Sequence, residues 1–183
     1  MKTALAVMMW LALLCGAHAA DDAKKEPLAI SIVVPVVNDA EKTWYHSNSG
    51  RNIYSFRVLV ENTSDTPQSI CRESCSWGWS ALSFELTDPK GKKFTATRKL
   101  KEWTRNFPEC WVLQPHEFLV LDVNLGDDTW EGSPDVWDNY GGSPLFTLRA
   151  IFAIASDDAF KSEKQPPWTG RVESAEEKIH LIP

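Results

Sequence analysis

Two cysteines, Cys71 and Cys75, stand four residues apart in the stretch SICRESCSWGW and are the residues of this chain best suited to chemistry. Two thiolates at this spacing, together with a histidine, suit Cu(I), because soft sulfur ligands select that ion. His46, His116 and His180 all lie far from the pair in sequence. A thioredoxin-like redox motif needs C-x-x-C within an alternating strand and helix pattern, and the sequence has neither. Copper handling therefore stays an alternative function.

The same two cysteines could instead form a disulfide. In a straight strand their Cα atoms would lie about 13 Å apart, at about 3.3 Å per residue, whereas a disulfide needs less than about 7 Å. A helical turn would bring the two Cα atoms to about 6 Å from each other, and the polar residues between the cysteines, Arg72-Glu73-Ser74, can form such a turn. We therefore expect a Cys71–Cys75 disulfide. Pairing of Cys110 with one of them, or metal or redox work, is the alternative.

Tryptophan is abundant, with nine in the chain, and most should fill the core because each ring buries a large area. If the strand that carries Leu82 is regular back to Ser76, then Trp77 and Trp79 fall on the opposite face from Leu82. A bulge at Gly78 would reverse this assignment. Exposed rings would suit a carbohydrate or an apolar partner surface.

The longest irregular segment predicted from the sequence is a loop at residues 126–143, rich in glycine and aspartate. Long loops on a rigid scaffold often carry function. Trp130 and Trp137 lie in this loop and are secondary candidates for binding.

The N-terminal residues resemble a secretory signal peptide. Lys2 precedes an apolar run at residues 4–14, and Ala17 and Ala19 supply the small residues that a signal peptidase reads. We expect residues 1–19 to be a signal peptide, residues 20–27 a charged flexible linker and residues 28–183 a single domain of a secreted or periplasmic protein. A lipid anchor at Cys15 is the alternative. No later apolar run reaches the length of about 20 residues that a membrane span needs.

Charge and motifs narrow the function classes. Without residues 1–19 the chain has 18 Lys and Arg (19 less Lys2) against 25 Asp and Glu, a formal charge near −7. This acidic balance argues against nucleic acid or anionic lipid as a partner. The sequence has no G-x-S-x-G, H-E-x-x-H, phosphate-binding loop or dinucleotide fingerprint. We therefore expect no enzymatic activity, no cofactor and no metal site.

Period-two alternation of apolar residues dominates the chain after residue 27, which predicts half-buried strands. The predicted strands are residues 30–36, 54–60, 82–86, 92–97, 111–113, 119–125, 146–154, 172–174 and 179–182. Short strands separated by turn signals are typical of an antiparallel, immunoglobulin-like β-sandwich of about seven to eight strands. A β-barrel is the alternative.

Three stretches carry a resemblance to a known family. They are Asn62-x-Ser64-Asp65-x-x-Gln68, Phe84-Glu85-Leu86-x-Asp88-x-x-Gly91-Lys92 and Leu113-x-Pro115-x-Glu117. On these residues the chain resembles bacterial exported immunoglobulin-like domains and, more loosely, the BsuPI-type proteinase-inhibitor domain. His116 stands where that family has glycine, and no inhibitory residue is carried over.

Together these features predict a secreted, non-enzymatic β-sandwich that binds a macromolecular partner, either a protein or a glycan. The expected contacts are loops and the surface of Trp77 and Trp79. A carbohydrate-binding module that uses exposed tryptophan is the first alternative, and copper handling is the second.

Overall fold

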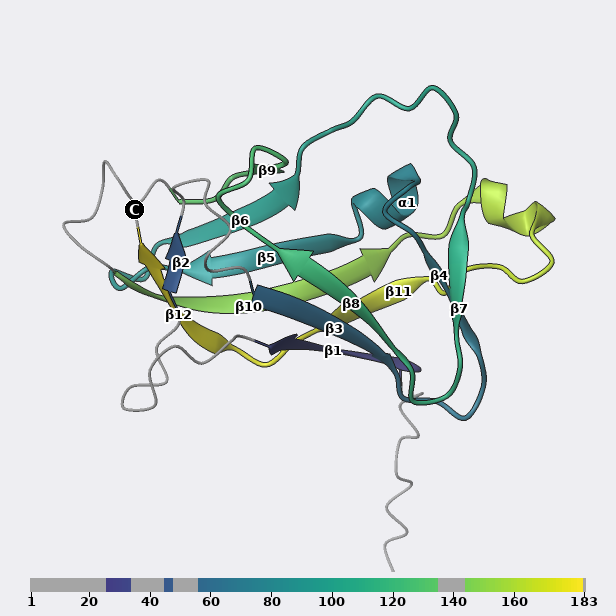
Figure 1. Ribbon diagram of the computed structural model, residues 1–183, viewed down its shortest axis with the longest axis horizontal. Helices are drawn as coiled ribbons and strands as arrows, with labels where there is room; N and C mark the ends of the chain where they lie inside the picture. Colours follow the sequence, from purple (N-terminus) through teal and green to yellow (C-terminus); the bar gives the residue numbers. More distant parts are fainter. Residues whose placement is uncertain (1–25, 34–44, 48–55, 135–143, 183) are drawn as a thin grey trace, which may run out of the picture.

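The computed structural model describes residues 26–33, 45–47, 56–134 and 144–182, whose regular structure is almost all β-strand (Figure 1). The strands are β1 (Leu28–Val33), β2 (Tyr45–Ser47), β3 (Phe56–Asn62), β4 (Gln68–Cys71), β5 (Leu82–Thr87), β6 (Lys93–Arg98), β7 (Cys110–Leu113), β8 (Phe118–Val123), β9 (Trp130–Glu131), β10 (Leu145–Ile154), β11 (Gly170–Glu173) and β12 (Glu177–Ile182). The helical elements in these ranges are α1 (Ser76–Trp79) and the 3₁₀ turn η1 (Asp158–Ser162).

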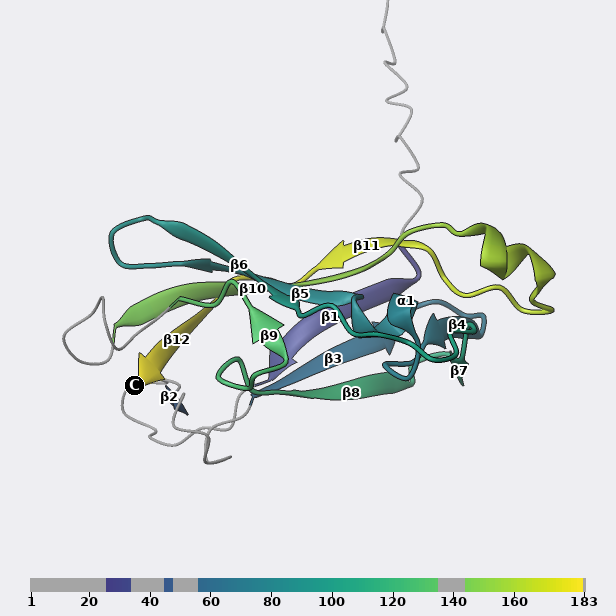
Figure 2. The same cartoon turned by 90° about the horizontal axis from the view of Figure 1, so that it is seen from above.

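The strands form two facing layers (Figure 2). One layer is the sheet β1–β3–β8, and the other is the larger sheet β2–β12–β10–β5–β6–β9, in which β11 also pairs with β10. A separate ribbon of β4 and β7 lies at one end of the molecule. Among the described strands, only the pairing of β12 with β2 is parallel. The prediction of an all-β, antiparallel fold is therefore confirmed.

The core lies between the layers because each strand directs alternate side chains inward. The alternate apolar residues of β3 and β5 are at most 2% exposed. The rings of Phe56 and Phe84 join the two layers edge to face, with centroids 5.4 Å apart. Burial of one such ring contributes about 1.5–3 kcal/mol, so this alternation is the main source of stability.

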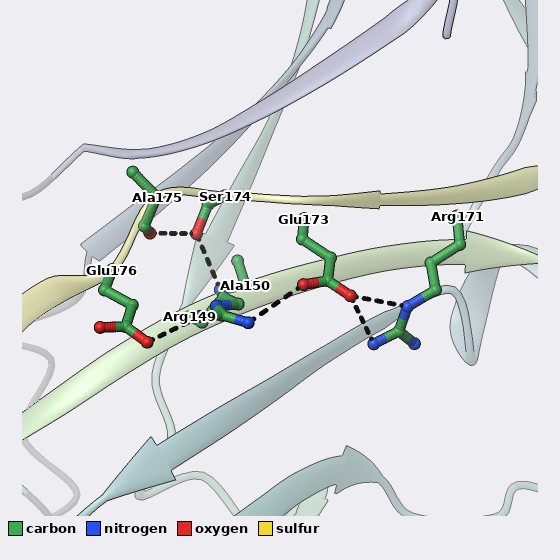
Figure 3. A network of polar contacts seen from close by, with 7 residues as sticks. All are labelled: Arg149, Ala150, Arg171, Glu173, Ser174, Ala175 and Glu176. Carbon is green, nitrogen blue, oxygen red and sulfur yellow. Dashed lines mark hydrogen bonds and ion pairs between the residues drawn. The ribbon is translucent and has the colours of Figure 1, made fainter. Parts of the chain in front are cut away.

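The end of the chain pairs twice with β10 (Figure 3). β11 lies opposite residues 151–154 and β12 opposite residues 145–148. Residues 174–176 consequently face only residues 149 and 150. One extra residue in a strand is a β-bulge, which bends the strand and increases its twist.

Polar side chains stabilise this bulge, as Figure 3 shows. Ser174 Oγ accepts a hydrogen bond from the N–H of Ala150 at 3.0 Å. Arg149 forms ion pairs with Glu173 at 3.2 Å and with Glu176 at 2.7 Å. Arg149 thus links the two ends of the bulge.

Most of the predicted strands are present, with ends shifted by one or two residues. The alternation at residues 82–86, 92–97, 111–113, 146–154 and 179–182 corresponds to β5, β6, β7, β10 and β12. The structure adds β2 and β9, which are too short to show alternation, and β4, which is buried on both faces. The predicted signal peptide and most of the linker lie outside the described residues.

Candidate binding surface

Trp77 and Trp79 lie in the short helix α1. The N–H of Trp79 donates to the carbonyl of Cys75 at 2.9 Å, which is the hydrogen-bond pattern of an α-helix. Strand β5 begins only at Leu82. The condition of a regular strand back to Ser76 is therefore not met, and the face that strand parity would give the two tryptophans does not apply.

Both indoles are half-buried and hold α1 to neighbouring segments. Trp77 Nε1 donates to Asp157 Oδ2 at 2.9 Å, and its ring packs against Phe160 with centroids 5.5 Å apart. Trp79 Nε1 donates to the carbonyl of Lys99, also at 2.9 Å. Because each indole N–H already has a partner, neither donates to a ligand while these contacts persist.

Trp130 is buried, at 5% exposure, beneath Arg98. The Arg98 guanidinium lies 4.2 Å from the Trp130 ring centroid and 4.7 Å from that of Trp79. Its terminal nitrogens donate to Thr129 Oγ1 at 2.6 Å and to Glu73 Oε1 at 3.0 Å. Its Nε has no hydrogen-bond partner within the described ranges. Two of the predicted binding tryptophans, Trp79 and Trp130, thus contact one cation whose side chain is 10% exposed.

A cavity of about 420 Å³ adjoins this arginine. It is lined by Arg57, Arg98, Asp122, Val123, Asn124, Asp127 and Trp130. Arg57 and Asp122 pair with each other at 3.0 Å, and the N–H of Thr129 lowers the pKa of the Asp127 carboxyl. Two arginines balance two aspartates here, so the lining gives no preference for a ligand of either charge.

Trp137, the remaining predicted tryptophan, lies outside the described residues.

Half of the large apolar side chains that are exposed in the described residues lie elsewhere, on residues 99–112, which we call the 99–112 surface. Residues 99–109 connect β6 to β7 and run past α1 as the long loop in Figure 1, and residues 110–112 belong to β7. The 99–112 surface carries four of the eight large apolar side chains that are exposed in the described residues: Leu100 (99%), Phe107 (70%), Trp111 (40%) and Val112 (44%). Clusters of exposed apolar side chains mark interaction sites.

Cations flank these apolar side chains. Lys99, Lys101 and Arg105 are exposed in the loop. The Arg72 guanidinium lies 4.8 Å from the Trp111 ring centroid, on the adjoining ribbon. The 99–112 surface therefore combines apolar anchors with three cations and two anions, Glu102 and Glu109, a formal charge of +1 (3 − 2) in a chain whose formal charge is −6.

The neighbouring segment 72–76 supports the loop. Asn106 Oδ1 accepts a hydrogen bond from the N–H of Ser76 at 2.9 Å. Ser74 Oγ donates to Glu109 Oε2 at 2.7 Å. Sequence reasoning missed this surface because the stretch RKLKEWTRNF at residues 98–107 has no strand or helix period. The available signal was its mixture of cations with large apolar residues.

Three cysteines lie beside the base of the loop, and all are free thiols. Cys71 Sγ is 3.7 Å from Cys110 Sγ, whereas Cys75 Sγ donates to the carbonyl of Arg72 at 3.2 Å. Burial, together with the neighbouring thiols, raises the pKa of Cys71. The Cys71–Cys75 disulfide therefore stays a prediction.

No cluster of three or more His, Cys, Asp or Glu suited to a metal ion occurs in the part of the chain that the structure describes.

Comparison of the chain with protein-family models gives no match, and comparison with curated proteins gives none either. The resemblance to exported immunoglobulin-like domains thus depends on the sequence stretches quoted above. Within the described ranges, no helix has the length and apolar character needed to cross a membrane.

Proposed function

We propose that this chain is a secreted or periplasmic, non-enzymatic binding protein of immunoglobulin-like β-sandwich architecture. Its 99–112 surface binds a partner protein that presents acidic groups around an apolar pocket. The observation that carries the proposal is the gathering of half of the exposed large apolar side chains of the described residues in this one segment.

The apolar side chains supply the affinity. Leu100 is 99% exposed and Phe107 is 70% exposed, so nearly all of Leu100 and most of Phe107 is available for burial by a partner. Burial of such a side chain contributes about 1.5–3 kcal/mol. A few buried anchors of this kind dominate the energy of most protein interfaces.

The charges favour an acidic protein over nucleic acid or anionic lipid. An extended polyanion would meet the field of the whole chain, whose formal charge is −6, and would be repelled. A compact acidic patch would meet mainly the cations of the loop, because salt screens charges more than about 8 Å away at physiological ionic strength. Lys99, Lys101 and Arg105 would then set the orientation and the association rate.

The tryptophans of α1 support this surface in the proposal. Trp79 holds the Lys99 carbonyl at the start of the loop, and the residues before α1 hold its far end through Glu109. Interaction loops bind best when a rigid scaffold presents them.

A random peptide library displayed on phage, selected on the immobilised protein at about 0.15 M salt, tests the proposal. We expect enrichment of peptides that combine Asp or Glu with large apolar residues. Their affinity should fall at least about tenfold for Leu100→Ser/Phe107→Ser and for Lys99→Glu/Arg105→Glu. Val120→Ser is the matched control, because Val120 is 47% exposed but lies on β8. Absence of enrichment, or equal binding by all these variants, contradicts the proposal.

A further inference from the structure

Cys71 and Cys110 lie directly opposite each other at the end of the β4–β7 ribbon. The N–H of Arg72 donates to the carbonyl of Glu109 at 2.7 Å, so the bond joins the residue after Cys71 to the residue before Cys110. In an antiparallel ladder such a bond flanks a non-hydrogen-bonded pair, whose Cα atoms lie about 4.5 Å apart. Disulfides span Cα distances of about 4.4–6.8 Å, so the backbone already has the required spacing.

A second contact fixes the same register. Ser69 is two residues before Cys71 and faces Val112, so it belongs to the next non-hydrogen-bonded pair of the ribbon. Its carbonyl points away from β7 and accepts a hydrogen bond from the N–H of Trp168 at 2.7 Å. The pairing of Cys71 with Cys110 therefore follows from the whole ladder.

The sulfur atoms distinguish the two candidate partners of Cys71. Cys110 Sγ is 3.7 Å away and its residue is partly exposed, so an external oxidant can reach it. Cys75 is 0% exposed, and its Sγ donates to the Arg72 carbonyl at 3.2 Å. Its thiol is thus shielded and already bonded.

We propose that Cys71 and Cys110 form a cross-strand disulfide that closes the base of the loop between β6 and β7, while Cys75 remains a buried free thiol. The oxidant is a disulfide, either of a thiol oxidoreductase or of glutathione. The Cys110 thiolate attacks one sulfur of that disulfide and releases the first thiol. The Cys71 thiolate then attacks Cys110 Sγ and releases the second. Two electrons pass to the oxidant, and the two cysteine protons end on the two released thiols.

The burial of Cys71 slows the second of these steps. Only the thiolate attacks, and burial raises the pKa of the Cys71 thiol. The disulfide, once formed, joins the residue that ends β4 to the residue that begins β7, so it fixes the base of the loop whichever partner the loop binds. The inference is independent of the proposed binding function.

Mass mapping of the purified full chain, equilibrated with reduced and oxidised glutathione and then alkylated, tests the pairing. We expect a Cys71–Cys110 linked peptide pair, with Cys75 alkylated only after unfolding. Cys75→Ser should retain the linked pair and Cys110→Ser should lose it. A Cys71–Cys75 link, an intermolecular link through Cys110, or alkylation of Cys71, Cys75 and Cys110 alike in the folded chain under oxidising conditions overturns the proposal.

Limited digestion with trypsin gives an independent readout that uses the unaltered chain. The exposed Lys99, Lys101 and Arg105 lie between Cys75 and Cys110 in sequence. Cleavage in this loop leaves the two fragments joined on a non-reducing denaturing gel if Cys71 is bonded to Cys110. Separate fragments on that gel contradict the proposal, because a Cys71–Cys75 bond would lie wholly within the N-terminal fragment.

Discussion

The side-chain amide of Asn62 donates to the backbone carbonyl of Leu113, a buried contact of 3.0 Å between the ends of β3 and β7. Nδ2 of Asn62 also donates to the Thr66 carbonyl at 2.9 Å, and Oδ1 accepts from the N–H of Ser64 at 3.0 Å. Asn62 is 0% exposed, so every polar atom of its amide needs a protein partner. This one amide joins β3, the turn that follows it and the β4–β7 ribbon.

Asn62→Ala should lower the free energy of unfolding by about 2–4 kcal/mol, because each lost hydrogen bond costs about 1 kcal/mol and the buried Leu113 carbonyl loses this side-chain donor. Denaturant titration measures the change. Thr66→Ala is the control and should cost less than about 0.5 kcal/mol, since Thr66 is exposed. A similar small loss for Asn62→Ala would show that the amide does not organise this turn.

Gly78 lies in α1 with its backbone against the carbonyl of Arg72. A Cβ at this position would stand 2.0 Å from the Arg72 oxygen. Helix propensity alone would favour Gly78→Ala by about 1 kcal/mol, but an overpacked site costs about 1–3 kcal/mol, and here the opposing atom is backbone. We expect a net destabilisation, measured by denaturant unfolding.

Gly91→Ala is the comparison variant for Gly78→Ala. Gly91 has φ +84° and no heavy atom within 4 Å of an added Cβ, so only backbone strain of about 1 kcal/mol should appear. Stabilisation by Gly78→Ala would mean that α1 moves away from the Arg72 carbonyl at little cost.

The alternation of apolar residues was enough to predict the all-β, antiparallel fold. Strands such as β5 and β10 bury every second residue, so their sequences carry the period that the structure shows. Strand β4 does not: Ser69, Ile70 and Cys71 are all buried, because both faces of this ribbon strand are covered. No period-two signal exists for such a strand, and β4 was missed.

The environment of the tryptophans could not be predicted from parity, because Trp77 and Trp79 precede β5 and sit on a helix that depends on distant contacts. Asp157 and Lys99, which bind the two indole N–H groups, lie 80 and 20 residues away in sequence. The backbone conformation of His116 could not be predicted from its residue type either. His116 has φ 65° in the turn before β8, a left-handed conformation that glycine adopts most readily.

Arg98 should be sensitive to a change that preserves its charge. Its planar guanidinium contacts the rings of Trp79 and Trp130 and bonds to Glu73 and Thr129. The ammonium group of lysine is not planar and does not present several N–H donors in a fixed geometry. Since each cation–π contact contributes about 0.5–2 kcal/mol, Arg98→Lys should lower the free energy of unfolding by about 1–3 kcal/mol, as measured by denaturant titration.

Arg57→Lys is the matched control for Arg98→Lys. Arg57 pairs with Asp122 at 3.0 Å, but the two side chains are 62% and 73% exposed, and exposed ion pairs contribute less than about 1 kcal/mol. We expect little change in this variant. Equal effects of the two substitutions would contradict the structural role assigned to Arg98.

Asp157 makes the contact of Trp77 dependent on pH. The N–H of Ala159 and then the indole N–H of Trp77 hold the pKa of the Asp157 carboxyl below its usual value of 3.8. The unfolded chain therefore binds this proton more readily, and the stabilisation present at neutral pH is lost as the pH falls below 3.8 toward the folded-state pKa.

Asp157→Asn should reduce the loss of stability between pH 7 and about pH 3, measured by denaturant unfolding. Trp77→Phe should have a smaller effect in the same direction, because the larger cause, the N–H of Ala159, remains. An acid-induced loss as large in Asp157→Asn as in the unaltered chain would exclude this carboxylate as a source of the pH dependence.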